Sequence, residues 1–398
     1  MDFSSSSTHM TTSIIPEGAT LVEAPGLATA RKPSFANPLN MALNEGTYAP
    51  EACREIFARF AQREACRRYS SSDNAPLKAR IADLHGVGPE SVFLGHGSGP
   101  ILKEGIVTLI KSAIVSSPTR IMRHVLQLRG FPIITPVPSY SKVAAGAVRN
   151  KLGLVTLPLR PENGWALDLD ALRRVLKRRS GLVYLCNPNN PTGTELIRRF
   201  ELVDLLESFP RSIFWVDEAY IHYLEPHEEQ RVADLTARFP NLVVSRSFSF
   251  AYGLAAIRLG YMIATPSFVE KLQSKHVPYR QGLFQEELAL AALNDEEHLP
   301  FVRRETARAR QQLTEALADH PYIELFPSQA HFMLCRFRDG RAARPFVARM
   351  RHRGIDLRVF ESVKQHTFDE YFRITLGTEP ENQHLIESIH DVLPVLRA

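Results

Sequence analysis

Short apolar runs alternate with amphipathic segments from about residue 119 onward, and this alternation restricts the possible folds of the chain most strongly. Segments 167–176 and 202–208 have the apolar spacing of helices. A chain in which strands alternate with helices favours a mostly parallel sheet that is covered by helices. The expected strands of this sheet are 131–137, 153–157, 182–186, 214–216 and 242–244.

The length and composition of the chain predict a globular protein with two domains. Its 398 residues are 44% hydrophobic and 23% charged, which is ordinary for a protein with a large core. Residues 1–38 are rich in Ser, Thr, Pro and Ala, so we expect a flexible N-terminal tail. We predict a large domain at 39–290 that holds the sheet, followed by a smaller C-terminal α/β domain at 291–398.

Several sequence signals argue against other classes of protein. The chain has no run of 18 apolar residues and no basic segment followed by an apolar one at its start, so we expect neither a membrane span nor a signal peptide. Its four cysteines lack the spacing of a metal site and indicate reduced thiols in a cytoplasmic protein. The net charge of +5 comes from arginines spread along the chain, so no nucleic-acid partner is expected.

Polar residues follow three of the expected strands at the point where each strand ends. Asn190, Asp217 and Ser247 stand at these positions. Ligands bind at the carboxyl ends of the strands in parallel sheets, so these residues predict a binding site. The turn Gly97-Ser98-Gly99 precedes a helix that we expect to begin at residue 100 or 101. Backbone N–H groups ahead of a helix form a natural cradle for a phosphate group.

Four motifs occur in an order that identifies a family. They read NPNNPTG at 187–193, DEAY at 217–220, SRSFSFAYGLAAIRLGY at 245–261 and FRITLG at 372–377. Together they resemble the class I/II aminotransferases, which use pyridoxal phosphate (PLP), and most closely the histidinol-phosphate aminotransferase branch. The resemblance implies the fold-type-I α/β architecture, with a large domain whose mostly parallel sheet lies between helices and a smaller C-terminal domain.

The resemblance also implies which residues hold the cofactor. Asn190 and Tyr220 would contact its ring oxygen, Asp217 would face its pyridine nitrogen, and Tyr140 would stack on its ring. Tyr69 would reach the phosphate bound by the neighbouring subunit, so a homodimer is expected. The residues that would hold the phosphate within the chain are Gly97, Ser98, Gly99, Ser247 and Arg258.

On the substrate side, the resemblance implies recognition of an amino or keto acid. Arg373 matches the family's clamp for the substrate α-carboxylate. Asn44 lies in the family's entry strand beside the substrate, and residues 39–60 would contribute to this side of the site. His331 stands where the family usually has an asparagine near the substrate, and His96 precedes the phosphate loop. Both histidines, and His222, could carry a proton near neutral pH, or could simply be hydrogen-bonded or exposed.

One departure from the family pattern concerns catalysis. The family carries its Schiff-base lysine at the position that is Phe250 in this chain. Phenylalanine can neither bond to the cofactor nor move protons, and a positioned acid–base group contributes ~10²–10⁴ in rate. Lys142 and Lys103 could in principle substitute for the lost amine.

Three functions remain open at this point. The first is an enzyme that binds PLP or its amine form, pyridoxamine phosphate (PMP), non-covalently and acts on an amino or keto acid without a Schiff-base lysine. The second is the same fold repurposed for catalysis without PLP. The third is a non-catalytic protein that binds a ligand or a partner subunit.

Overall fold

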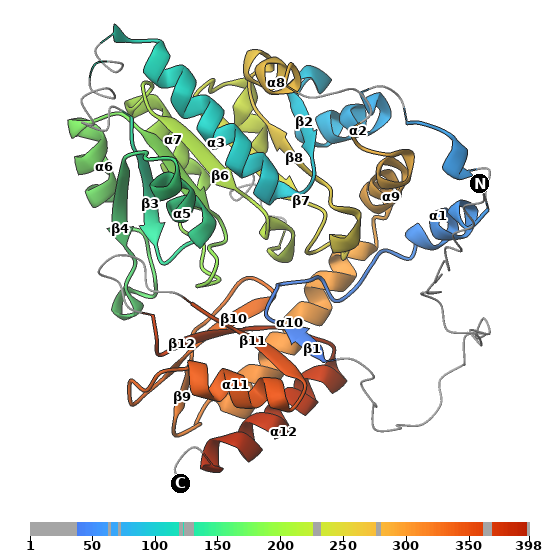
Figure 1. Ribbon diagram of the computed structural model, residues 1–398, viewed down its shortest axis with the longest axis vertical. Helices are drawn as coiled ribbons and strands as arrows, with labels where there is room; N and C mark the ends of the chain where they lie inside the picture. The colour runs from blue at the N-terminus through green and yellow to red at the C-terminus, as the bar shows by residue number, and fades with distance from the viewer. Residues whose placement is uncertain are drawn as a thin grey trace, which may run out of the picture. The chain divides into compact units, whose positions relative to one another are not determined.

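The computed structural model describes residues 38–62, 65–70, 73–118, 122, 131–225, 232–275, 280–360 and 368–395. The predicted tail at 1–38 lies outside these ranges except for its last residue. Two sheets organise the described residues, and helices lie along both of them (Figure 1). None of the helices in the described ranges is long and apolar enough to cross a bilayer.

The first sheet has seven strands, in the order β2-β8-β7-β6-β5-β3-β4. Strands β4, β3, β5, β6 and β7 run parallel to one another, and β8 is antiparallel to both β7 and β2. The prediction of a mostly parallel sheet is therefore confirmed. The strands are β2 Val92–Gly95, β3 Ile133–Val137, β4 Leu154–Pro158, β5 Leu182–Cys186, β6 Ile213–Asp217, β7 Leu242–Ser247 and β8 Gly260–Ile263.

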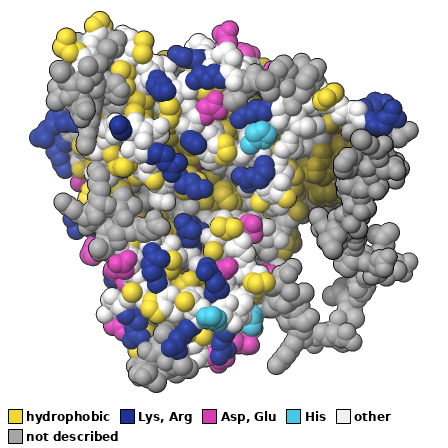
Figure 2. Space-filling model, viewed as in Figure 1, with side chains coloured by type: hydrophobic (Ala, Val, Ile, Leu, Met, Phe, Trp, Pro, Cys, Tyr) yellow, Lys and Arg dark blue, Asp and Glu magenta, His cyan; other side chains and the backbone are white. Residues whose placement is uncertain are grey.

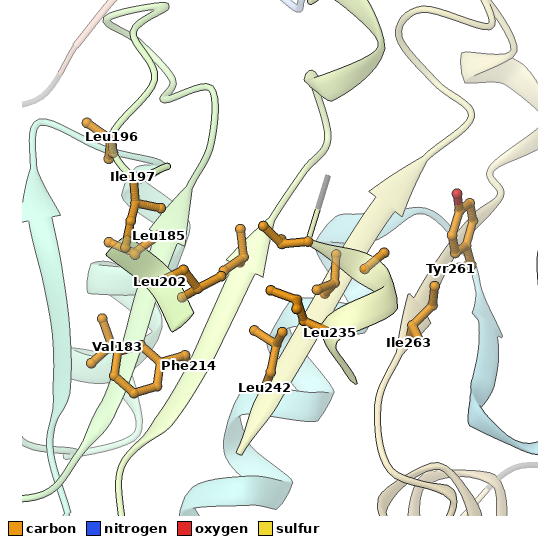
Figure 3. Packing of buried hydrophobic residues seen from close by; sticks show 14 of the residues in the cluster. Val183, Leu185, Leu196, Ile197, Leu202, Phe214, Leu235, Leu242, Tyr261 and Ile263 are labelled. Atoms are coloured by element: carbon orange, nitrogen blue, oxygen red, sulfur yellow. The ribbon is translucent and has the colours of Figure 1, made fainter. Parts of the chain in front are cut away.

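Helices cover both faces of this sheet because its central strands are apolar on both sides. Val183 and Leu185 of β5 belong to one hydrophobic cluster, and Leu182 and Tyr184 belong to a second cluster on the opposite face. Figure 3 shows part of the first cluster, in which Leu202 of α7 packs near the strands. The helices of this half are α1 Cys53–Phe60, α2 Ala75–His85, α3 Ser98–Val115, α5 Ser141–Arg149, α6 Leu169–Arg178, α7 Arg199–Ser208, α8 Pro266–Gln273 and α9 Leu283–Asn294.

The first residues of two of these helices follow from the chemistry of the residues just before them. Asp168 caps α6, because its side chain accepts a hydrogen bond from the Ala171 N–H at 2.8 Å. Helix α3 begins at Ser98, ahead of the expected start at 100 or 101, because Gly97 takes a φ of 86° and turns the chain directly into the helix. Ser98 and Gly99 therefore belong to the first turn of α3.

The second sheet has five strands, in the order β1-β11-β12-β10-β9. Its strands are β1 Leu39–Met41, β9 Ile323–Leu325, β10 Phe332–Phe337, β11 Ile355–Val359 and β12 Tyr371–Thr375, and its helices are α10 His298–Leu317, α11 Arg344–His352 and α12 Glu379–Val395. Strand β1 pairs in parallel with β11, so the start of the described chain joins the strands of its C-terminal part. The domain boundary near residue 290 stays a prediction.

The charged side chains are distributed over the visible surface. On the face drawn in Figure 2, Lys and Arg side chains are interspersed with acidic and hydrophobic ones. The sequence assigns a net charge of +5 to the whole chain. This distribution on one face agrees with the spread of arginines along the sequence.

Candidate active site

The ends of three neighbouring strands place three predicted residues at one edge of the seven-stranded sheet. Asp217 is the last residue of β6, and Ser247 is the last residue of β7. Asn190 follows β5 in the next loop, and β5, β6 and β7 pair in parallel. This edge is where parallel sheets bind ligands, as expected from the sequence.

Asp217 is a buried carboxylate whose partners are neutral. It accepts hydrogen bonds from the Tyr184 hydroxyl at 2.9 Å and from Ser245 Oγ at 3.0 Å. Burial raises the pKa of Asp217 to about 6, although these hydrogen bonds oppose the increase. A cation beside this carboxylate would stabilise its ionised form.

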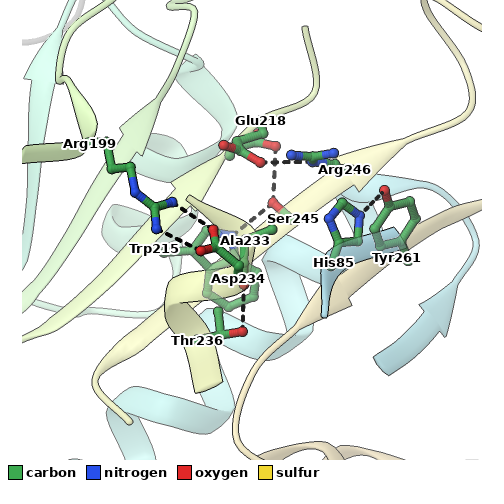
Figure 4. Close-up of polar contacts among 11 residues, drawn as sticks. His85, Arg199, Trp215, Glu218, Ala233, Asp234, Thr236, Ser245, Arg246 and Tyr261 are labelled. Atoms are coloured by element: carbon green, nitrogen blue, oxygen red, sulfur yellow. Dashed lines mark hydrogen bonds and ion pairs between the residues drawn. The ribbon is translucent and has the colours of Figure 1, made fainter. Parts of the chain in front are cut away.

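A network of buried polar side chains supports the strands beneath Asp217. The Trp215 ring N–H donates to Ser245 Oγ at 2.9 Å (Figure 4). Ser245 Oγ in turn donates to Asp217. Arg246 donates to Glu218 at 2.8 Å, and both side chains are almost completely buried. Buried hydrogen bonds of this kind restrict the side chains that take part in them, so the two bonds of Ser245 help to orient the Asp217 carboxylate.

Tyr220 joins two asparagines that are distant in sequence. Its hydroxyl accepts hydrogen bonds from the Asn190 amide at 3.0 Å and from the Asn44 amide at 3.1 Å. Since both lone pairs of the hydroxyl are used, its own proton remains to be donated. The Asn190 carbonyl in turn accepts a 2.6 Å hydrogen bond from Arg373 Nη1. Four residues predicted from sequence therefore form one connected group.

Arg373 carries a buried positive charge without a carboxylate partner among the described residues. Its side chain lies on β12, and Nη2 donates to the Ala42 carbonyl at 2.6 Å. The buried Nε has no hydrogen-bond partner in the described part of the chain. Burial lowers the pKa of Arg373 to about 10, and the charge of Arg358 adds to this effect. A buried unpaired cation is costly, so the site favours an incoming anion.

Arg358 is a residue that the sequence reasoning missed. It lies on β11 directly opposite Arg373 of β12, so both side chains leave the same face of the sheet. Arg358 is exposed, and its charge also acts on the Tyr140 hydroxyl. The alternating pattern IDLRV at 355–359 offered a signal, but only the strand register pairs the two arginines.

The predicted phosphate cradle is assembled from two segments. A Cβ atom on Gly97 would lie 2.9 Å from Arg258 Nη2, and one on Gly260 would lie 2.8 Å from the Ser98 nitrogen. Ser247, which precedes Arg258 in the same sequence motif, is buried. Its Oγ accepts a hydrogen bond from the Ser249 N–H at 3.0 Å. The start of α3 and the Arg258 guanidinium together have the chemistry of an anion site.

Tyr140 and His96 are two further predicted residues near this cradle, and they differ in their burial and in the direction of their pKa shifts. The Tyr140 hydroxyl would lie 3.5 Å from a Cβ atom on Gly99. Burial, helped by the Asp217 charge, raises the pKa of Tyr140 to about 12, so its phenol stays protonated. His96 is largely exposed, and partial desolvation of its ring, together with the charges of Arg280 and Arg258, lowers its pKa.

Phe250 packs in an aromatic group beside the polar network. Its ring stacks on Tyr220 with a centroid separation of 4.6 Å and lies 5.8 Å from the ring of His331. His331 stacks on Tyr223 at 4.2 Å, and its Nε2 donates to the Asn44 carbonyl at 2.9 Å. Burial lowers the pKa of His331 to about 3, so this histidine is neutral at physiological pH.

Several other candidates lie away from this group or are open to solvent. Tyr69 is 82% exposed. Lys142 and Lys103 are exposed on α5 and α3. His222 is half-buried and packs edge-on against Tyr252 at 5.0 Å. The roles of all these residues stay predictions.

Comparison with known proteins identifies the family. Residues 37–389 match the family described as aminotransferase class I and II. The chain is 31% identical over 367 residues to a histidinol-phosphate aminotransferase of Anaeromyxobacter sp. (strain Fw109-5), covering 91% of this chain and 93% of the relative. It is 32% identical over 327 residues to histidinol-phosphate aminotransferase 2 of Pseudomonas fluorescens, covering 82% and 81%.

A solved structure supports the same fold. The histidinol-phosphate aminotransferase of Sinorhizobium meliloti, in complex with pyridoxal-5'-phosphate, superposes with a TM-score of 0.75 at 24% identity, covering 90% of this chain and 92% of that one. The fold is therefore fold-type I, as predicted. The chain belongs to the class I and II aminotransferase family.

Proposed function

We propose that this protein is an aminotransferase-family enzyme that binds PLP or PMP non-covalently and acts on an amino or keto acid without a Schiff-base lysine. One observation carries the proposal. The residues expected to hold the cofactor ring and the substrate anion are connected around Tyr220, and Phe250 stacks on this tyrosine at 4.6 Å. The family resemblance assigns the Schiff-base lysine to the position of Phe250.

The residues present fit a phosphorylated pyridine. Asp217 is buried with neutral partners, and a protonated pyridine nitrogen would supply the missing positive charge. Gly97 and Gly260 have no space for a Cβ atom, so the backbone at the start of α3 lies close to Arg258 and to β8. Tyr220 has a proton left to donate to a ring oxygen. When bound, the cofactor supplies an electron sink for a carbanion on the substrate.

Arg373 and Arg358 support recognition of an acidic substrate. The orphaned Nε of Arg373 and the adjacent guanidinium of Arg358 offer donors on one face of the sheet. Planar guanidinium groups bind carboxylate and phosphate with paired hydrogen bonds. The relatives' names refer to a phosphorylated substrate, and this pair of arginines is compatible with either a phosphate or a carboxylate.

The aromatic surroundings argue against ordinary transamination. A lysine would both bond to the cofactor and transfer protons, and Phe250 offers neither an amine nor a proton. His331 is nearby, but its pKa of about 3 makes it a weak base. We therefore infer that any reaction is independent of a fixed amine. The same observation favours a second candidate, a non-catalytic protein that binds the cofactor or a partner subunit.

Assembly and location belong to the same proposal. The exposed Tyr69 supports a homodimer in which one subunit completes the site of the other. The four cysteines are all unpaired, which agrees with a cytoplasmic protein.

The decisive test replaces Phe250 in full-length protein. With PLP and borohydride, the wild-type chain should show no fixed cofactor by intact mass, although PLP and PMP should perturb its absorption or fluorescence on binding. Phe250→Lys should gain the mass of one cofactor and a new absorption band, because the side chains have similar reach. Phe250→Leu is the matched control, since it removes the ring without adding an amine.

Two outcomes would overturn the proposal. A reduced adduct on Lys142 or Lys103 of the wild-type chain would mean that a substitute amine exists. A folded Phe250→Lys variant that neither binds nor bonds to PLP would mean that the pocket no longer accepts the cofactor.

A further inference from the structure

A groove lies beside the edge strand of the five-stranded sheet, between the end of β1 and helix α11. It has a cavity volume of about 420 Å³, within the range of small-molecule sites. Leu43, which is 58% exposed, lies on one wall. The helix on the other wall contributes Arg344, Val347, Ala348 and Arg351.

The residues from α11 form a single stripe. Positions 344, 347, 348 and 351 follow the spacing of one helical face. The two arginines are separated by two turns, roughly 10 Å along the helix axis. The groove therefore has a guanidinium group near each end of this stripe and aliphatic side chains between them.

The residues that line the groove carry more positive than negative charge. Arg351 pairs with Asp356, which is the acidic residue among those that line the groove. Arg344 and Arg358 also line it, and neither makes an ion pair or a side-chain hydrogen bond with any described residue. An apolar floor with unpaired guanidinium groups is complementary to a molecule with an apolar body and a negative head.

We propose that this groove is a binding site for a small amphiphilic anion, with an apolar body and a carboxylate or phosphate head. The groove adjoins the candidate active site, but binding of an anion there does not depend on the proposed reaction. Ala42 lines the groove, and its carbonyl accepts the hydrogen bond from Arg373 Nη2. The occupant could therefore be a separate ligand or the far end of a substrate, since both present the same chemistry.

Calorimetric titration of the PMP-loaded, full-length protein with phenyl phosphate tests the site. We expect saturable binding that weakens as salt is added, because the contacts are exposed charges. Arg344→Gln should lower the affinity about fivefold to tenfold, and Arg351→Gln should lower it less, because the Arg351 guanidinium already pairs with Asp356. The double variant should lower the affinity further. Arg349→Gln is the matched control, since Arg349 is exposed on the same helix and does not line the groove.

An Arg373→Gln variant separates the two sources of the anion. Loss of affinity in the α11 variants alone identifies a separate ligand. Loss in both the α11 and Arg373 variants identifies the far end of a substrate that spans both places. The proposal is overturned if phenyl phosphate does not bind, or if its affinity responds to Arg373→Gln and not to the α11 variants. Circular dichroism confirms that each variant is folded.

Discussion

At the scale of single residues, Asp217 is held in a protonation state that depends on what lies beside it. Its carboxylate is 3% exposed and receives hydrogen bonds from two hydroxyl groups, while no cation contacts it among the described residues. Its pKa is therefore raised to about 6, above the ordinary value of 3.8. The folded protein without cofactor binds this proton more tightly than the unfolded chain does.

This shift predicts the sign of a pH effect on stability. Between about pH 4 and pH 6 the native state holds more protons than the unfolded state, so the free energy of unfolding falls as pH rises. The total loss is about 3 kcal/mol as an upper limit, for a shift of roughly two pKa units. Urea unfolding without cofactor should show this decline in the wild-type chain and a flatter profile in Asp217→Asn.

The exposed Asp319 provides the comparison for this measurement. Asp319→Asn also removes one acidic group, but its side chain lies at the surface after α10. Its profile should run parallel to that of the wild-type chain. Parallel profiles for Asp217→Asn and wild type would mean that Asp217 does not titrate as the buried geometry requires.

At the scale of elements, the segment after β1 is pressed against the segment that contains Phe250. A Cβ atom on Gly46 would lie only 1.8 Å from the Phe250 carbonyl oxygen. A Cβ atom on Gly253 would lie 2.1 Å from the Tyr48 carbonyl oxygen, and Gly253 has a φ of 61°. Two glycines therefore allow two backbones to approach closely, which positions Asn44 for its hydrogen bond to Tyr220.

This contact predicts a large effect of one added methyl group. Gly46→Ala should lower the free energy of unfolding by about 1–3 kcal/mol, because the clash involves backbone that cannot rotate away. The variant should also weaken PMP binding, since Asn44 would move with the segment. Chemical denaturation and PMP titration measure the two effects.

Gly146 offers a matched control for the same substitution. It lies inside α5, and a Cβ atom there would meet nothing within 4 Å. Gly146→Ala should stabilise the protein by about 0.5–1 kcal/mol, because alanine favours the helix. If both variants change stability alike, the close approach at Gly46 is not rigid.

At the scale of the whole molecule, one region exposes aromatic side chains that a single chain leaves uncovered. Tyr69 is 82% exposed, and Phe57 on α1 is 49% exposed. Helix α1 lies beside α9 (Figure 1). The Phe57 ring packs edge-on against Phe284 with a centroid separation of 5.7 Å. Large exposed aromatic groups are enriched at protein interfaces, so this region supports the proposed homodimer.

The dimer has a direct test in solution. Sedimentation should report a dimer at micromolar concentration, and Phe57→Lys should shift it toward monomer, because a charge would be buried at the interface. Tyr69→Ser should keep the dimer and lower PMP affinity, since its hydroxyphenyl group is expected to reach the partner's phosphate. A wild-type monomer would contradict both the assembly and the role of Tyr69.

The sequence alone was sufficient for features that depend on neighbouring residues. Apolar runs at 182–186 and 242–244 became buried strands because a strand covered on both faces needs continuous apolar residues. The cap at Asp168 and the turn at Gly97 also follow from short-range chemistry. The expected strand ends then indicated Asn190, Asp217 and Ser247, and the structure brings these strands side by side.

Tertiary structure decided what depends on strand pairing and burial. The partnership of Arg358 with Arg373 follows from the register of β11 and β12, and β1 pairs with a strand more than three hundred residues later. Asn44 meets Tyr220 although they are 176 residues apart. The shifted pKa values of Asp217 and His331 arise from burial by distant segments. Local patterns specify which element forms, whereas such contacts exist only once the whole chain has packed.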